Sequence, residues 1–253
     1  GAGVKVAILD TGIDLDHPDL AVAGGYNCIN PRRTADDDNG HGTHVAGIIA
    51  ARQNAIGVVG VAPGISLYAV KALDRYGSGY LSDIIEGLGW CVSHDIDVVN
   101  MSFGGEGIVP GFTAAISQAA AAGIVLVAAA GNESVEMSNS YPAAYPEVIA
   151  VSACDANGAF ANFSNFGSGI AIIAPGVKIY STWPGGRYLT LSGTSMAAPH
   201  VAGTVALLLE DYPGFSPGQV RQALRSTAEN LGLPATRQGA GLADAEKMSG
   251  YAP

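Results

Sequence analysis

Short apolar runs alternate with segments of helical periodicity along most of the chain. Strands are predicted where apolar residues follow one another, and helices where they recur every three or four positions. The predicted strands are Val4–Leu9, Leu67–Ala72, Val98–Met101, Ile124–Ala129, Val148–Ser152 and Ile170–Ala174, and the predicted helices are Thr43–Ala51, Leu81–Val92, Phe112–Ala122, Ala197–Glu210 and Pro217–Thr227. Nearly continuous apolar strands between helices are typical of a parallel sheet with helices on both faces, so we expect an α/β fold.

The composition favours one large folded domain over residues 1–253. Hydrophobic residues make up 48% and charged residues 13% of the 253 positions, which excludes intrinsic disorder. A chain of this length buries a sizeable core without needing a disulfide or a metal to fold. No linker, repeat or low-complexity segment interrupts it, and no apolar run is long enough to cross a membrane.

Charge and cysteine content exclude further classes. The chain has 12 basic and 22 acidic residues, a net charge of −10, so it repels phosphate backbones and nucleic acid is not an expected partner. The cysteines are Cys28, Cys91 and Cys154. An odd, sparse set without CxxC spacing argues against a disulfide framework or a zinc site of that kind. Buried free thiols are expected, with one disulfide and one free thiol as the alternative.

Four segments place reactive side chains at the ends of predicted elements. Asp10 ends the first strand before Gly12, where open α/β sheets carry ligands and catalytic groups. Asn132 follows the strand that ends at Ala129, and Ser195 precedes a long helix whose N-terminus favours negative charge. Taken singly, Asp10 and Asn132 are equally compatible with turns, and Ser195 with a helix cap.

The fourth segment, Asn39–Gly47, places His41 where a loop enters a helix. The glycines on both sides of His41 are expected to leave its imidazole approachable. His41 and His44 lie on one helical face, so a metal pair is conceivable, but Gly42 stands where a zincin carries its glutamate. We expect His44 to be packed and hydrogen-bonded. The preceding Asp36–Asp38 is interpreted as a solvated loop, or otherwise as a site for a cation or a basic substrate residue.

The order of these residues separates the possible mechanisms. In an α/β-hydrolase the catalytic residues follow one another along the chain in the order serine, acid, histidine. Here only His200 follows Ser195, and no acidic residue lies between them, so this order cannot be filled. An aspartic protease needs a second Asp-Thr/Ser-Gly, and a dinucleotide-binding domain needs Gly-x-Gly-x-x-Gly after its first strand; the chain has neither. The order Asp10, His41, Ser195 remains.

These segments together resemble the subtilisin-like serine protease family, from Val4 to about Met248. The resemblance implies a three-layer α/β fold and an endopeptidase in which Ser195 attacks the scissile carbonyl, His41 transfers the proton and Asp10 orients His41. Asn132 and the Ser195 backbone N–H would bind the oxyanion. The alternative is a non-catalytic domain of the same fold that binds a peptide or propeptide without cutting it.

The resemblance also implies substrate and calcium sites. Substrate would be held as an extended strand and by pockets for large apolar or aromatic residues before the cut, with Glu133 at the rim admitting Lys or Arg. The residues concerned are Ser78, Gly79, Leu81, Ser102, Phe103, Gly104, Ala129, Gly131 and Ser140. Structural calcium would be bound by the side chains of Asp19 and Asn54 and the carbonyls of Arg52, Ile56 and Val58. Acidic residues of a second, weaker cation site are missing near Gly169–Ala171.

The chain begins next to its first strand, whereas family members carry a preceding segment with one further calcium ligand. The calcium site is therefore expected to be weakened, or that segment to have been removed. The resemblance further implies a monomer that is made with an inhibitory N-terminal propeptide, is secreted, and acts on proteins or peptides. An intracellular location is the alternative, because no signal peptide is visible in the sequence.

Overall fold

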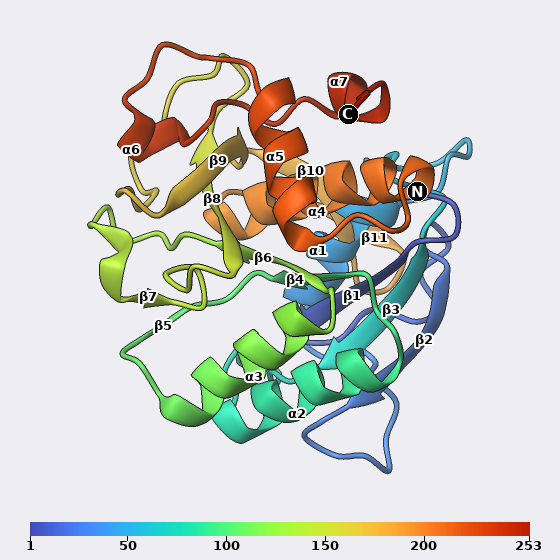
Figure 1. Cartoon of the computed structure of the whole chain (residues 1–253). Helices are drawn as coiled ribbons and strands as arrows, with labels where there is room; N and C mark the ends of the chain where they lie inside the picture. The colour runs from blue at the N-terminus through green and yellow to red at the C-terminus, as the bar shows by residue number, and fades with distance from the viewer.

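A seven-stranded parallel sheet forms the centre of the computed structural model, which describes all 253 residues (Figure 1). The strand order is β2-β3-β1-β4-β6-β8-β9, and every pairing is parallel. The strands are β1 (Lys5–Asp10), β2 (Val22–Asn27), β3 (Ser66–Lys71), β4 (Val98–Met101), β6 (Val125–Ala129), β8 (Val148–Cys154) and β9 (Ile170–Pro175). All six predicted strands are confirmed to within two residues. The edge strand β2 was missed because its glycine-rich sequence has no apolar run.

Helices cover both faces of this sheet, as the sequence predicted. On one face lie α1 (His41–Ala50), α4 (Thr194–Asp211) and α5 (Pro217–Thr227); on the other lie α2 (Leu81–Ser93) and α3 (Pro110–Ala121) (Figure 1). Strand β1 shows why two layers are needed, since Val6 and Ile8 join the core under α1 and α4 while Ala7 and Leu9 join the core under α2 and α3. A strand with apolar side chains on both faces is stable only when both are covered.

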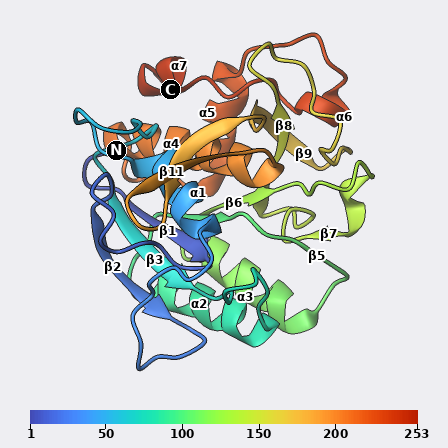
Figure 2. The ribbon, with the colours of Figure 1, turned by 180° about the vertical axis from the view of Figure 1, so that it is seen from behind.

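The remaining elements are short and were not predicted. Strands β10 (Ile179–Trp183) and β11 (Arg187–Leu191) form an antiparallel hairpin beside α1, seen from behind in Figure 2. Strand β5 (Gly105–Glu106) pairs with β7 (Ser140–Tyr141). The 3₁₀ turn η1 (Met137–Asn139) and the short helices α6 (Ala235–Gln238) and α7 (Ala245–Ser249) complete the fold. None of the helices has the length and apolar character needed to cross a membrane.

The three cysteines are buried and unpaired, which confirms the prediction of free thiols. Burial raises the pKa of Cys28 to about 12 and that of Cys154 to about 11, and it also raises the pKa of Cys91. A high pKa leaves almost no thiolate at neutral pH, so these residues are chemically inert in the folded chain.

Candidate active site

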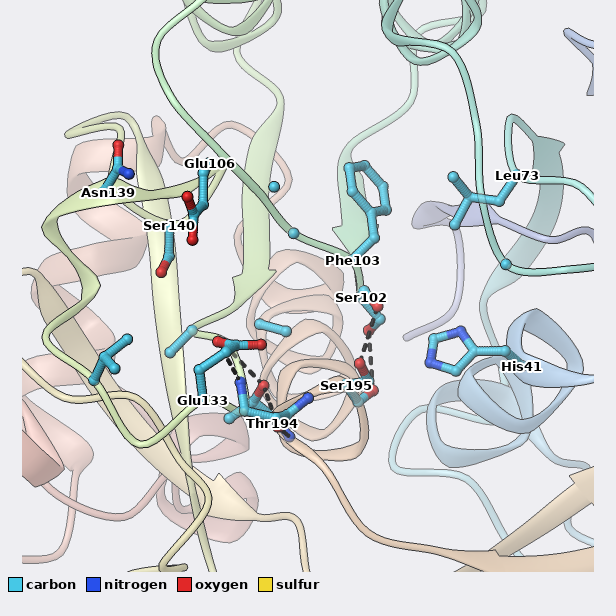
Figure 3. A pocket seen from close by; sticks show the side chains of 18 of the residues that line it. His41, Leu73, Ser102, Phe103, Glu106, Glu133, Asn139, Ser140, Thr194 and Ser195 are labelled. Atoms are coloured by element: carbon cyan, nitrogen blue, oxygen red, sulfur yellow. Dashed lines mark hydrogen bonds between the residues drawn. The ribbon is translucent and has the colours of Figure 1, made fainter.

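Three neighbouring central strands end at one edge of the sheet and bring the predicted residues together. Strand β1 ends at Asp10, β4 leads into Ser102, and β6 leads into Asn132. Parallel strands place their carboxyl ends on the same side, which is where open α/β sheets bind ligands. His41 begins α1 and Ser195 is the second residue of α4. Except for buried Asp10, these side chains line one cavity of about 600 Å³ (Figure 3).

Asp10 lies behind His41 and holds its ring. The Asp10 carboxylate is fully buried, and its Oδ1 accepts hydrogen bonds from the Thr11 amide at 2.7 Å and from His41 Nδ1 at 2.8 Å. Burial, the largest single influence, lowers the pKa of His41, but the charge and hydrogen bond of Asp10 and the charge of Asp37 together raise it above its ordinary value. With Nδ1 donating to Asp10, Nε2 of the neutral ring is the nitrogen free to accept a proton.

The glycines on both sides of His41 allow neighbouring elements to pack closely, in addition to leaving the His41 ring accessible. A Cβ on Gly40, whose φ of +119° suits glycine, would come within 2.4 Å of the Trp183 ring. A Cβ on Gly42 would come within 2.1 Å of the Gly12 carbonyl oxygen. Because neither residue has a side chain, the start of α1 can lie close to the end of β1 and to the β10–β11 hairpin. This close approach brings His41 within hydrogen-bond distance of Asp10.

Asp37 stabilises the same turn. The interpretation of Asp36–Asp38 as a solvated loop holds for Asp36 and Asp38, which are exposed, but is wrong for Asp37. The Asp37 side chain is buried, and it accepts hydrogen bonds from three backbone amides and two hydroxyls. The donors are the amides of Asn39, Gly40 and Thr43 and the hydroxyls of Thr11 and Thr43. The first turn of a helix leaves amides without partners, and Asp37 satisfies them immediately before and after His41. Asp38 instead pairs with the buried Lys71 at 2.6 Å.

His44 faces away from the cavity. It is buried, and its Nε2 lies 3.2 Å from the Ile179 carbonyl oxygen and 3.0 Å from that of Leu189, both in the β10–β11 hairpin. The prediction of a packed, hydrogen-bonded histidine is confirmed. The chain contains no group of three or more His, Cys, Asp or Glu side chains arranged to hold a metal ion.

Ser195 and Ser102 are joined by two hydrogen bonds. The Ser195 hydroxyl donates to the Ser102 carbonyl oxygen at 2.9 Å, and the Ser102 hydroxyl donates to the Ser195 carbonyl oxygen at 2.9 Å. The His41 imidazole faces Ser195 from the other wall of the cavity (Figure 3). Ser195 thus sits at a helix N-terminus, where backbone amides favour developing negative charge.

Thr194 orients the Asn132 amide, a contact for which the sequence carried no signal. Asn132 Oδ1 accepts from the Thr194 amide at 2.8 Å and from the Thr194 hydroxyl at 3.0 Å. Since the oxygen end of the amide is occupied, the Nδ2 end is the one available to a ligand. The resulting donor lies in the same cavity as Ser195.

Eight of the nine predicted substrate residues line one of two cavities. Five of them join Ser102 and Ser195 in lining the first cavity: Phe103, Gly104, Ala129, Gly131 and Ser140. Ser78 and Gly79 line a second cavity of about 330 Å³ with Tyr80 and Asp83, although Leu73 and Gly77 of the same loop reach the first one. Leu81 lines neither of these cavities and packs, partly buried, against the core under α2 and α3.

Asn165 fixes one end of the first cavity and was not predicted. Its buried Oδ1 accepts from the amides of Glu133 and Val135 at 3.1 and 3.0 Å, and its Nδ2 donates to the Ala130 carbonyl oxygen at 3.1 Å and to Glu133 Oε2 at 2.7 Å. Asn165 lies in a segment without a motif, so only its contacts identify it. Two further glutamates line this cavity with Glu133, namely Glu106 and Glu136.

The five predicted calcium ligands lie in one loop region around Asp19. The Asp19 carboxylate is fully buried, forms no ion pair, and accepts only from neutral groups. These groups are Asn54 Nδ2 at 2.7 Å, the Val58 amide at 3.2 Å and the Tyr188 hydroxyl at 3.1 Å. A buried carboxylate without a cationic partner, bonded to an amide side chain, offers the oxygen ligands that Ca²⁺ prefers.

Comparison with known proteins adds independent findings. The model of the subtilase family matches residues 1–242. The chain is similar to Subtilisin DY from Bacillus licheniformis, with 51% identity over 235 residues that cover 92% of this chain and 86% of the relative. It is also 51% identical to Subtilisin E from Bacillus subtilis (strain 168), covering 92% of this chain but 62% of that longer relative.

Among solved structures, the chain is similar to the crystal structure of a cold adapted subtilisin-like serine proteinase. The TM-score is 0.87 at 35% identity, and the match covers 96% of this chain and 87% of that one.

Proposed function

Because this chain belongs to the subtilase family and is a subtilisin-like serine endopeptidase, we propose that Asp10, His41 and Ser195 are its catalytic triad. The observation that carries this assignment is the convergence of Ser195 with His41 in one cavity, while the buried Asp10 is bonded to the far nitrogen of His41.

In the proposed mechanism, Ser195 Oγ attacks the scissile carbonyl carbon while His41 Nε2 takes the hydroxyl proton. The bond to Asp10 holds the required tautomer and stabilises the imidazolium that forms. His41 then protonates the leaving amine, and the acyl group stays bonded to Ser195 Oγ. Water then attacks this acyl-enzyme, with His41 again as the base, and the acyl group leaves as a carboxylic acid. For the first attack, the Ser195 hydroxyl exchanges its hydrogen bond to the Ser102 carbonyl oxygen for one to His41 Nε2.

The negative charge on the carbonyl oxygen needs donors that are already in place. We assign this role to Asn132 Nδ2 and the Ser195 backbone N–H. Thr194 supports the assignment, because its two bonds to Asn132 Oδ1 prevent the amide from presenting its oxygen to the cavity. A donor that is fixed before the reaction costs no reorganisation when charge develops.

The first test is the intact mass of the chain after incubation with a fluorophosphonate in calcium-containing buffer. A single adduct on Ser195 is expected, absent from Ser195→Ala and retained by Ser192→Ala, an exposed serine three positions away. An adduct elsewhere, or none on a chain shown to be folded, would contradict the assignment and favour the non-catalytic peptide-binding alternative.

The cavity supports cleavage after large apolar or aromatic residues, and its carboxylates extend this to Lys and Arg. Ala129, Gly131 and Ser140 leave room for a large side chain, while Glu106, Glu133 and Glu136 line the same space with no Lys or Arg among them. Cleavage-site profiling of a denatured protein is expected to show both classes before the cut. Glu133→Gln should reduce cleavage after Lys and Arg more than cleavage after Phe. An equal effect on both classes would contradict this role.

Members of this family generally bind calcium, and we propose that Asp19, Asn54 and the carbonyls of Arg52, Ile56 and Val58 hold a structural Ca²⁺ here. The ion would compensate the buried Asp19 charge and stabilise the folded chain by mass action. Thermal unfolding of the Ser195→Ala chain should occur at higher temperature in calcium than in chelator, and Asp19→Asn should remove that difference. Equal unfolding temperatures in both buffers would refute the site.

We propose further that residues 1–253 form one peptidase domain, that the chain acts as a monomer on proteins or peptides after export, and that an N-terminal propeptide inhibits it before maturation. The extended cavity along the ends of β1, β4 and β6 supports a propeptide bound as a substrate strand would be. Inhibition of peptide cleavage by a separately added propeptide from the same precursor would test this, and full activity with the propeptide in excess would contradict it.

A further inference from the structure

The carbonyl oxygen of Ser195 lacks its usual partner within α4. In an α-helix this oxygen accepts a hydrogen bond from the amide four residues later, and here that residue is Pro199, which has no N–H. The Ser102 hydroxyl takes the place of the missing amide, because it donates to the Ser195 carbonyl oxygen at 2.9 Å (Figure 3). The first turn of α4, which carries Ser195, is therefore held by a side chain from outside the helix.

Asn100 fixes the direction of that hydroxyl. The Asn100 side chain is fully buried, and its Nδ2 donates to Ser102 Oγ at 2.8 Å. A serine hydroxyl has one proton, and Ser102 gives this proton to the Ser195 carbonyl, so Ser102 Oγ can only accept from Asn100. The three residues thus form a directed chain of hydrogen bonds, from the Asn100 amide through the Ser102 hydroxyl to the Ser195 carbonyl.

The place of Asn100 in the sheet suits this role. Asn100 lies in β4, where it pairs with Ile8 of β1 on one side and with Val127 of β6 on the other. Successive residues of a strand face opposite sides of the sheet, and Val98 belongs to the core under α1 and α4, so Asn100 also faces α4. Asn100 does not line the first cavity, and it therefore reaches the site only through Ser102.

The contact with Ser102 is the only hydrogen bond that the Asn100 side chain makes. Its Oδ1 is buried and has no partner among the protein groups. An aliphatic residue at this position would avoid the cost of burying an amide between apolar strands. The stability of the core therefore does not explain the amide, whereas its bond to Ser102 does.

We propose that Asn100 is a positioning residue for the nucleophile, an inference that rests on the proposed catalytic role of Ser195. By directing the Ser102 hydroxyl to the Ser195 carbonyl, Asn100 sets where the first turn of α4 lies relative to β4. That turn carries both the attacking Oγ and the backbone N–H assigned to the oxyanion. A small displacement of the turn misaligns both groups and slows acylation more than it weakens substrate binding.

The test compares Asn100→Leu with the unsubstituted chain, because leucine has nearly the shape of asparagine but cannot donate. The substrates are a peptide p-nitroanilide with Phe before the cut and a fluorophosphonate. The value of kcat and the rate constant of fluorophosphonate labelling should both fall about tenfold, while KM stays within about twofold. Thermal unfolding in the Ser195→Ala background should not occur at lower temperature, because the variant no longer buries an unpartnered amide oxygen.

Further variants separate the chain of hydrogen bonds from a general effect on the core. Ser102→Ala should reduce kcat to a similar extent, and adding Asn100→Leu to it should cause no further loss. Asn100→Ala, which cannot crowd its neighbours, gives the same kinetic measurement if Asn100→Leu does not fold. The matched control is Ser152→Ala, since Ser152 is buried in β8 and its hydroxyl donates to the Arg237 carbonyl oxygen. This control should lower the unfolding temperature and leave kcat unchanged.

The outcomes distinguish this inference from the triad assignment. The positioning role is overturned if Asn100→Leu lowers only the unfolding temperature, or if its loss in kcat multiplies with that of Ser102→Ala. Equally fast labelling of Ser195 in Asn100→Leu and in the unsubstituted chain would also overturn it, with the triad assignment left intact. An unsubstituted chain that is folded and gives no adduct on Ser195 would overturn both.

Discussion

Asp37 is predicted to determine both the stability of the turn that carries His41 and the pH at which His41 loses its proton. The perturbation is Asp37→Asn, which keeps the size of the side chain but removes its charge and replaces one acceptor oxygen by a donor. In the unsubstituted chain, Asp37 Oδ1 accepts hydrogen bonds from the amides of Asn39 and Gly40, and Oδ2 accepts one from the amide of Thr43. Whichever way the new amide turns, at least one of these backbone amides faces an N–H group.

The magnitude follows from these contacts. An unsatisfied buried donor costs about 1–3 kcal/mol, and bonds to a charged acceptor are stronger than those to a neutral one. We therefore expect Asp37→Asn to lower the free energy of unfolding by about 2–4 kcal/mol. This is less than the 5–15 kcal/mol typical of folded domains, so the variant should still fold.

The effect on catalysis has a definite sign. The charge of Asp37 helps to raise the pKa of His41, so its removal lowers that pKa. His41 acts as a base only when neutral, and a lower pKa keeps it neutral to lower pH. The acid limb of kcat/KM, which reports the free enzyme, should therefore move to lower pH in Asp37→Asn.

Stability is measured by urea unfolding in the Ser195→Ala background, which prevents autolysis, and the pH profile is measured with Ser195 present. The matched control is Asp36→Asn, because Asp36 is exposed and its carboxylate accepts only from the Leu15 amide, at 3.3 Å. A loss below about 1 kcal/mol, an acid limb that stays in place or rises, or an equal effect of Asp36→Asn would refute the reasoning.

Three further predictions follow from buried groups outside the triad. Burial lowers the pKa of His44 to about 4, below the unfolded value of about 6.5, so its contribution is present above pH 6.5 and is lost as the pH falls towards 4. In urea unfolding, the Ser195→Ala chain should therefore lose about 3 kcal/mol more between pH 7 and pH 4 than the same chain with His44→Gln, and equal losses would exclude His44 as the cause. The raised thiol pKa values predict that Cys28, Cys91 and Cys154 do not react with Ellman's reagent at pH 8 in the folded chain, whereas all three react in denaturant; labelling in the folded chain would contradict their burial. Asn165→Ala should reduce kcat/KM about tenfold or more for peptide substrates with the fold intact, because it releases the Glu133 loop, and a change within twofold would show that the loop holds its position unaided.

The central strands and the main helices were predictable because their signal is local. Each buried strand is an apolar run, and each helix has its own periodicity, so the elements could be read without knowing their neighbours. The hairpin β10–β11 gave no such signal, because its only two buried residues, Ser181 and Thr182, are polar. Their hydroxyls donate to the carbonyl oxygens of His44 and Thr43 in α1, so tertiary contacts hold the hairpin in place.

The candidate site likewise contains some residues that the sequence predicted and others that only the structure revealed. Asp10, His41, Asn132 and Ser195 stand out because each occupies a distinctive motif at the end of an element, and their order along the chain separates this mechanism from others. Chain topology then explains their meeting, since parallel strands deliver their ends to one edge of the sheet.

The supporting residues could not be found this way. Asp37 reads as part of a charged loop, and Asn165 as an ordinary polar residue. Their surroundings come from segments distant in sequence, and burial, hydrogen-bond partners and charge compensation are properties of those surroundings. The amino-acid order alone thus determined the sheet, its covering helices and the reactive side chains, whereas tertiary packing decided which polar groups are buried, which are satisfied and which remain free to bind a ligand.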